Sequence, residues 1–204
     1  ACIANMTAIL EKAKARQSFV RLDMESSAYT QRTLDLFFGR FFPAFGPHVG
    51  VVIQSCLRRS DADVDRLIEA QARVRLCKGA YLEPADVAYS DKADVDRAYV
   101  RLMTRLMERG NYPGIATHDP RIITHARTFA EQHKIDPSRF EFQMLYGVRR
   151  DLQDELCRAG YNMRVYVPFG TQWYPYLMRR LAERPANIAF ILGNVVREAL
   201  HRSP

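Results

Sequence analysis

The segment VGVVIQSCLRRSDADVDRLIEAQARVRLCKGA, residues 49–80, decides the fold class. Its two ends, 49–55 and 73–80, are short apolar runs rich in valine, isoleucine and leucine, typical of buried strands. Between them, residues 64–71 carry apolar side chains at helical spacing, after a sequence at 60–63 that resembles a capping box. A strand, a helix and a second strand in direct succession predict two parallel strands joined by a crossover helix.

The same alternation continues along the whole chain. We predict strands at 18–24, 49–55, 73–80, 114–118, 140–147, 163–170 and 187–193. Helical spacing of apolar residues predicts helices that include 2–16, 33–38, 64–71, 95–110, 122–133, 152–160 and 174–184. The pairs Asp119-Pro120 and Asp136-Pro137 each offer a capping side chain followed by a proline, which is a helix-start signal. Strict alternation of this kind indicates a parallel sheet, either doubly wound or closed as a (β/α)8 barrel.

Two features favour the barrel. The chain contains neither GxGxxG nor GxxxxGK[ST], so a Rossmann or P-loop phosphate site has no support. Polar residues also end almost every strand, and the strand ends of a barrel converge on one mouth, where barrel active sites lie. These residues are Asp23, Gln54, Arg75, Lys78, Thr117, His118, Gln143 and Tyr166. Because seven strands are predicted, we expect one catalytic barrel domain over 1–204 that contains strands 2 to 8 and lacks the first.

Composition is that of an ordinary globular protein, with 48% hydrophobic and 26% charged residues in 204. The formal net charge of +7 makes nucleic acid or an anionic membrane conceivable partners, but no basic run exceeds two residues. The longest segment without Asp, Glu, Lys or Arg, 41–57, contains two prolines and two glycines, which excludes a spanning helix there. Four dispersed cysteines suit a reducing compartment, so we predict a cytoplasmic domain, with peripheral membrane association left open.

Asp23 and Arg75 are the first candidates for chemistry. Phe19, Arg21 and Asp23 share one face of a strand, so Asp23 either pairs with an arginine inside the barrel or orients a ligand or a catalytic arginine. Arg75 shares a strand face with Arg73 and Cys77. A buried guanidinium is costly unless an anionic or electron-rich group pairs with it, so Arg75 points to such a ligand.

Lys78 and Gly79 end the third predicted strand. Gly79 permits close approach of the backbone to a ligand, whereas Lys78 could be a Schiff-base nucleophile, an anion binder or an ordinary surface lysine. His118 is a satisfied histidine or a ligand contact, because no second histidine or cysteine lies at metal-ligand spacing. We therefore predict no metal site.

A helix near the C-terminus carries a second cluster. Tyr176, Arg179 and Arg180 lie on one helical face, beside the aromatic residues at 173–174. The arginines either pair with Glu183 on an exposed helix or bind a small carboxylate that has an apolar body.

The motifs FVRLDMES, VVIQS, VRLCKGAYLEP, ATHDPRII, RFEFQMLYGVR, RVYVPFG and WYPYLMRRLAERPAN occur in this order between residues 18 and 187. In this the chain resembles the bacterial monofunctional proline dehydrogenase family. The resemblance implies a distorted (β/α)8 barrel that binds FAD non-covalently without a Rossmann motif. It also implies oxidation of L-proline to Δ1-pyrroline-5-carboxylate by hydride transfer to flavin N5, the first step of proline catabolism to glutamate. Electrons would then pass to a membrane quinone, with the enzyme on the inner face of the membrane as one possibility.

The resemblance also assigns residues position by position. Arg75 matches the family arginine beside flavin N5, and Asp23 matches the strand-end aspartate of the active site. Positions that contact FAD in the family are matched by Met24, Gln54, Arg75, Lys78, Gly79, Ala80, Thr117 and His118. Positions around the proline ring and its carboxylate are matched by Tyr81, Leu145, Tyr166, Tyr176, Arg179 and Arg180.

Two other classes of function stay open at this point. One is a lyase or aldolase on the same barrel that forms a Schiff base at Lys78. The other is a basic nucleic-acid-binding domain, which would leave the polar strand ends unexplained.

Overall fold

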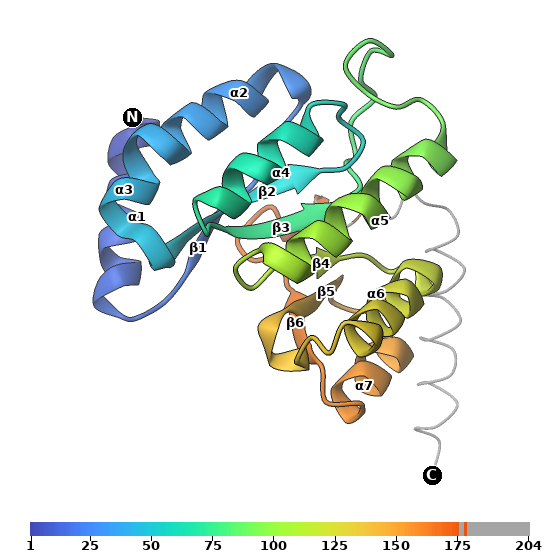
Figure 1. Ribbon diagram of the computed structural model, residues 1–204. Coiled ribbons are helices and arrows are strands. Elements are labelled where there is room, and N and C mark those ends of the chain that lie inside the picture. Colours follow the sequence, from blue (N-terminus) through green and yellow to red (C-terminus); the bar gives the residue numbers. More distant parts are fainter. Residues whose placement is uncertain (176–177, 179–204) are drawn as a thin grey trace. The chain divides into compact units, whose positions relative to one another are not determined.

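In the computed structural model, which describes residues 1–175 and 178, strands alternate with helices (Figure 1). The six strands of this part are β1 (Val20–Leu22), β2 (Val49–Gln54), β3 (Arg73–Cys77), β4 (Gly114–Ala116), β5 (Glu141–Leu145) and β6 (Asn162–Tyr166). Its α-helices are α1 (Cys2–Ala15), α2 (Ser27–Leu36), α3 (Phe42–Phe45), α4 (Ser60–Glu69), α5 (Lys92–Arg109), α6 (Pro120–Gln132) and α7 (Arg150–Arg158). Short π or 3-10 turns are η1 (Phe37–Phe41), η2 (Gly46–His48) and η3 (Pro137–Arg139). The predicted strand at 187–193 lies outside the described residues.

The first six predicted strands are therefore confirmed, although most are shorter than expected. The largest difference is at 18–24, where only Val20–Leu22 pairs as a strand. At 73–80 the strand ends at Cys77, so Lys78 and Gly79 belong to the connection that follows it. Asp23 and Thr117 also lie just beyond their strands, whereas Gln54 is the last residue of β2 and Arg75 lies within β3.

The chain forms two compact units, residues 1–141 and 142–204. In the first, β1, β2, β3 and β4 pair in parallel and in chain order, with Val20 opposite Val49 and Gly50 opposite Arg73. In the second, α7 packs on β6, and the Tyr146 amide donates to the carbonyl of Tyr166 at 2.9 Å. The prediction of a single domain over 1–204 stays a prediction.

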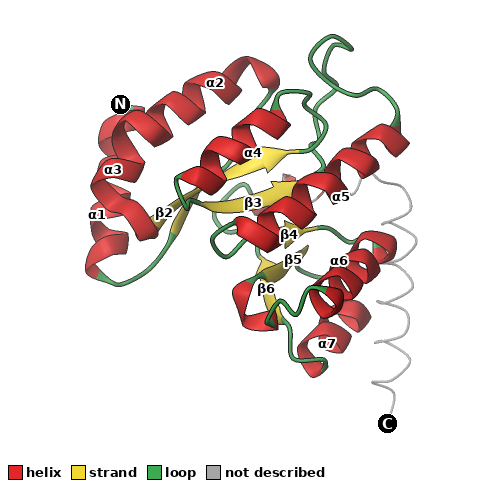
Figure 2. Ribbon diagram, in the orientation of Figure 1, coloured by secondary structure: helices red, strands yellow, loops and turns green. Residues whose placement is uncertain are grey.

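The two faces of β3 have different characters. Val74 and Leu76 are buried, whereas Arg73, Arg75 and Cys77 are partly exposed on the other face. Helices α4 and α5 lie along the strands β2 and β3 in Figure 2, with α4 against β2 and α5 against β3. This alternation confirms the prediction that Arg73, Arg75 and Cys77 share one face of the strand. It follows from strand geometry, in which successive side chains point to opposite faces of the sheet.

The helix starts are only partly as predicted. Asp119 caps α6 by accepting from the amide of Arg121 at 3.0 Å, and Asp136 caps the 3-10 turn η3 in the same way. The capping box expected at 60–63 is wrong, because α4 begins at Ser60 with no side-chain cap. The Ser60 hydroxyl donates instead to the carbonyl of Gln54 at 2.6 Å, and so ties the helix start to the end of β2.

Gly50 sits where β2 comes closest to its neighbours. A Cβ atom there would lie 2.4 Å from the carbonyl oxygen of Arg73 and 2.6 Å from the ring of Phe19. We expect Gly50→Ala to lower the free energy of unfolding by about 2 to 3 kcal/mol, since backbone atoms cannot move aside as side chains do. Chemical denaturation measures this, with Gly39→Ala as the control because a Cβ at Gly39 meets nothing within 4 Å. Equal stability of the two variants would contradict the close packing at Gly50.

Candidate active site

Polar side chains of the first unit gather at the carboxyl ends of its parallel strands. Asp23 follows β1, Gln54 ends β2, Lys78 follows β3 and Thr117 follows β4. Because the four strands are parallel and adjacent, their carboxyl ends lie at one edge of the sheet. The structure therefore brings these sequence-predicted residues to the same edge, as expected for a ligand site in this class of fold.

Arg75 and Asp23 face each other at this edge. Arg75 Nη1 lies 4.0 Å from Asp23 Oδ1, with the arginine side chain 24% exposed and that of the aspartate 71% exposed. Asp23 Oδ1 also accepts from the amide of Met24 at 3.0 Å. A pair this long and this exposed adds little to stability. The pair does place a mostly buried guanidinium near the carboxyl edge of the sheet, where a ligand of this fold class would bind.

Aromatic rings hold the other arginines of this strand face. The guanidinium carbon of Arg73 lies 4.3 Å from the ring centroid of Phe19 and 4.5 Å from that of Tyr112. Arg21 also lies over the ring of Phe19, at 5.0 Å. Contacts of this kind offset part of the cost of removing a guanidinium from water. Arg73 thus has a packing role below the site.

Gln54 ties the ends of β1 and β2 together. Its Nε2 donates to the carbonyl oxygens of Met24 at 3.3 Å and Glu25 at 3.0 Å, and the glutamine is buried. Gly79 lies against it with φ +100°, and a Cβ there would meet Cys56 Sγ at 2.4 Å. Only glycine fits this position, both for its backbone conformation and for its close approach to Gln54 and Cys56.

Lys78 lies between two carboxylates that the sequence analysis did not single out as its partners. Its Nζ is 2.5 Å from Asp96 Oδ1 and 3.0 Å from Asp119 Oδ2. Burial, the largest single influence, raises the pKa of both aspartates, but their favourable partners together outweigh it and the pKa of each is lowered. These partners are Lys78 and Lys92 for Asp96, and Lys78 and the Arg121 amide for Asp119. A Schiff-base nucleophile would first have to leave both carboxylates, so this geometry does not support the lyase alternative.

Hydrogen bonds of two glutamates, Glu25 and Glu83, join the connection after β3 to the segment that follows β1, and the sequence analysis missed both. The Tyr81 hydroxyl donates to Glu25 Oε2 at 2.5 Å. Glu83 accepts from both the amide and the hydroxyl of Ser27, at 2.7 and 2.5 Å, and so caps the start of α2 from another part of the chain. These partners are 56 residues apart in sequence, so no local pattern could have revealed them.

The remaining predicted site residues have these positions. Thr117 is buried, and its Oγ1 accepts from the amide of Asp119 at 3.1 Å, while His118 beside it is partly buried. Met24 is buried and Ala80 is exposed. In the second unit, Leu145 is partly buried and Tyr166 is exposed. The predicted substrate residues Tyr176, Arg179 and Arg180 lie outside the described residues.

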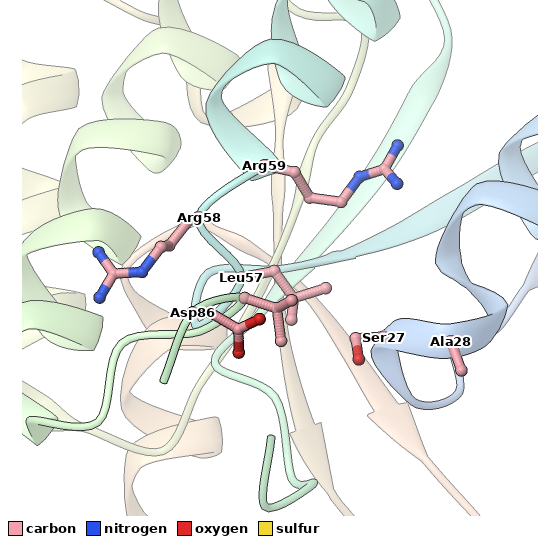
Figure 3. Close-up of a pocket in the computed structure, with 7 residues that line it drawn as sticks. Ser27, Ala28, Leu57, Arg58, Arg59 and Asp86 are labelled. Carbon is pink, nitrogen blue, oxygen red and sulfur yellow. The ribbon is translucent and has the colours of Figure 1, made fainter. Parts of the chain in front are cut away.

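A pocket of about 440 Å³ opens elsewhere in the first unit (Figure 3). It is lined by Ser27, Ala28, Leu57, Arg58, Arg59, Asp86 and Val87, none of which was predicted to bind a ligand. Figure 3 shows the Arg58 and Arg59 guanidinium groups pointing away from each other. Arg59 is bound to Asp63 and Gln31, and Arg58 donates to the carbonyl of Ala85. The charge of Arg59 is thus paired with a carboxylate, whereas Arg58 gives one of its five N–H donors to a neutral carbonyl.

Two cysteines lie beside the candidate site. Burial, with a smaller contribution from Cys77, raises the pKa of the Cys56 thiol to about 11, and burial also raises that of Cys77. Thiols with a raised pKa are weak nucleophiles at neutral pH, because the thiolate is the reactive form. Neither cysteine therefore suits nucleophilic catalysis.

Comparison with known proteins decides the family. The model of the family described as proline dehydrogenase matches residues 3–192. The chain belongs to the proline dehydrogenase family. It is 46% identical over 195 residues to proline dehydrogenase of Deinococcus radiodurans, which covers 96% of this chain and 63% of that protein. It is 44% identical over 194 residues to proline dehydrogenase 2 of Bacillus subtilis, covering 95% and 63%. The chain thus spans less than two thirds of the length of these relatives.

Solved structures support the same family. The chain superposes with a TM-score of 0.81 and 31% identity on the crystal structure of proline utilization A (PutA) from Bdellovibrio bacteriovorus. The protein in that crystal had been inactivated by N-propargylglycine. That match covers 88% of this chain and 21% of the PutA chain. The likeness confirms the predicted α/β fold of the barrel type.

We expect Cys56 and Cys77, the two thiols whose pKa is raised, to resist alkylation. At pH 8 a pKa of about 11 leaves roughly one Cys56 thiol in a thousand ionised. Iodoacetamide should therefore label the exposed Cys157 and leave Cys56 and Cys77 unmodified in the folded protein. Labelling of Cys56 should rise as the pH approaches 11, and labelling of both cysteines should rise when the chain is unfolded. Peptide mass mapping measures both, and fast labelling of Cys56 at pH 8 would contradict its burial.

Proposed function

We propose that this chain is the catalytic part of an FAD-dependent enzyme that oxidises L-proline to Δ1-pyrroline-5-carboxylate. Membership of the proline dehydrogenase family supports the reaction class. The single structural observation that carries the proposal is the place of Arg75, a guanidinium with a side chain only 24% exposed that lies 4.0 Å from Asp23 near the carboxyl edge of the sheet. A group that must accept two electrons needs such a cation beside it, because negative charge develops there.

The donor set at this edge fits FAD. Arg75 supplies positive charge for an anionic cofactor, Lys78 supplies an N–H donor, the buried Thr117 and Gln54 supply polar atoms, and Gly79 allows close approach of the backbone. We propose that these residues, with Met24, Ala80 and His118, hold the cofactor. Bound FAD would supply the hydride acceptor, flavin N5, for the ring carbon next to the proline nitrogen.

The chain's own residues would bind and orient the substrate. Oxidation removes a hydride from the ring carbon and a proton from the nitrogen, and leaves a carbon–nitrogen double bond. Asp23 would hold Arg75 in place. Tyr81, whose hydroxyl donates to Glu25, would contact the proline ring, and the family resemblance assigns the same role to Leu145 and to Tyr166. Arg179 and Arg180 would grip the proline carboxylate, since two guanidiniums can fork onto its two oxygens.

The proposed reaction is the first step of proline catabolism to glutamate, with a membrane quinone as the final electron acceptor. Among residues 1–175 and 178, no helix combines the length and the apolar character needed to cross a bilayer. We propose that the enzyme reaches this quinone by peripheral association with the inner face of the membrane. Flavin absorbance tests the core of the proposal: the purified full-length protein should be yellow, and anaerobic proline should bleach it.

We expect Arg75→Met to weaken FAD binding and to slow flavin reduction by proline about 100-fold. The reason is the loss of a desolvated cation where negative charge develops, worth about 3 kcal/mol by analogy with an oxyanion donor. Stopped-flow absorbance measures the reduction rate. Arg97→Met is a control, because Arg97 is exposed and pairs with Asp94 on the outside of α5. Unchanged reduction kinetics in Arg75→Met would refute the proposed role.

We expect Arg179→Lys or Arg180→Lys to raise the KM for proline at least about tenfold, because a compact ammonium cannot reproduce a forked contact to a carboxylate. FAD content should stay near that of the wild type, since the pair addresses the substrate. Pyrrolidine, which lacks the carboxylate, should be a poor substrate for the wild type and hardly poorer for the variants. Wild-type proline kinetics in either variant would contradict this role. That result would support the alternative in which the two arginines pair with Glu183 on an exposed helix.

A further inference from the structure

We propose that Asp96 and Asp119 are positioning residues that hold the Lys78 ammonium at the edge of the site, ready to donate to bound FAD. The inference rests on the proposed function, because it takes FAD as the ligand of Lys78. It adds two residues, on α5 and at the start of α6, that the family motifs quoted above do not single out as partners of this lysine.

The geometry fixes Lys78 from two different elements. Asp96 lies in the second turn of α5 and Asp119 is the N-cap of α6, and their carboxylates approach Nζ to 2.5 and 3.0 Å. The three side chains are 13%, 28% and 23% exposed, in the order Lys78, Asp96 and Asp119. A lysine has a long flexible stem whose rotamer freedom is costly to lose when a ligand binds. Two partially buried anchors remove that freedom before the ligand arrives.

The ammonium retains a donor for a ligand. An ammonium group carries three N–H donors and the two carboxylate contacts take at most two of them. Lys78 directly follows β3 and immediately precedes Gly79, whose backbone closely approaches Gln54 and Cys56. The third N–H donor of Lys78 is therefore held at the same edge of the sheet as Gln54 and Arg75.

Charge alone would have the opposite effect. Asp96 also accepts from Lys92 at 3.0 Å, so two lysines face two aspartates and the cluster has no net charge. Neutralising either aspartate would leave excess positive charge beside an anionic cofactor, which by Coulomb attraction would strengthen binding. Positioning predicts weaker binding instead, so the sign of the change distinguishes the two effects.

The test is the affinity of the full-length apoprotein for FAD, measured by flavin fluorescence or calorimetry in Asp96→Asn and Asp119→Asn. Both changes keep the shape of the side chain, and asparagine at 119 retains the oxygen that caps α6 toward Arg121. We expect each to raise the Kd for FAD about tenfold, the ratio expected for one lost charge-assisted hydrogen bond. Asp96→Glu, which keeps the carboxylate, should recover part of the affinity.

Asp94→Asn is the matched control, because Asp94 lies on the same helix and pairs with the exposed Arg97. It should bind FAD as the wild type does, and the melting temperature of each apoprotein shows whether it is folded. The flavin circular dichroism of Asp96→Asn should also move toward that of Lys78→Met, a change that a purely structural role would not produce.

A double-mutant cycle shows whether the aspartates act through Lys78. In a Lys78→Met background, Asp96→Asn should weaken FAD binding no further. An undiminished effect in that background would overturn the proposal, as would wild-type or tighter binding by both asparagine variants. A wild-type protein that takes up no FAD would instead overturn the proposed function together with this inference.

Discussion

The parallel pairing of β2 with β3 is the constraint on which the site of the first unit depends. Gly50 lies opposite Arg73 and Gln54 lies opposite Cys77 in this register. The pairing continues past the strands, where the amide of Ser55 donates to the carbonyl of Cys77 and the amide of Cys56 donates to that of Lys78, at 2.8 and 2.9 Å. A shift by one residue would turn the arginines of β3 into the apolar core.

This register separates packing from chemistry on a single strand. Val74 and Leu76 are buried, and the Tyr99 hydroxyl from α5 donates to the carbonyl of Leu76 at 3.1 Å. The opposite face carries Arg73, held between aromatic rings, and Arg75 near Asp23. Helix α5 contributes both to the packing and to the site. Its Tyr99 packs against β3, and its Asp96 forms an ion pair with Lys78 just after the end of that strand.

Several arginines on the helices form ion pairs with nearby aspartates. Asp61 contacts both Arg101 and Arg105, and hydrogen bonding to Arg101 lowers the pKa of Asp61 despite its partial burial. Arg59 is bound in the same way by Asp63, one turn further along. The arginines of these helices are therefore paired with carboxylates, and the nucleic-acid alternative gains no support from them.

The order of strands and helices, the family, and the residues at the strand ends of the first unit could all be predicted from the sequence. Local signals suffice for these, because apolar spacing, capping aspartates and chemical motifs are properties of contiguous residues. The partners of Lys78 and Tyr81 could not be predicted, since Asp119 and Glu25 lie 41 and 56 residues away from them. The role of Ser60 could not be predicted either, because its hydroxyl donates to the carbonyl of Gln54 at the end of β2 and does not cap its own helix. Sequence by itself thus determined which chemical groups this protein has and on which elements they lie. Only the tertiary structure decided which of them meet, because parallel pairing brings together the ends of strands that are distant in the chain.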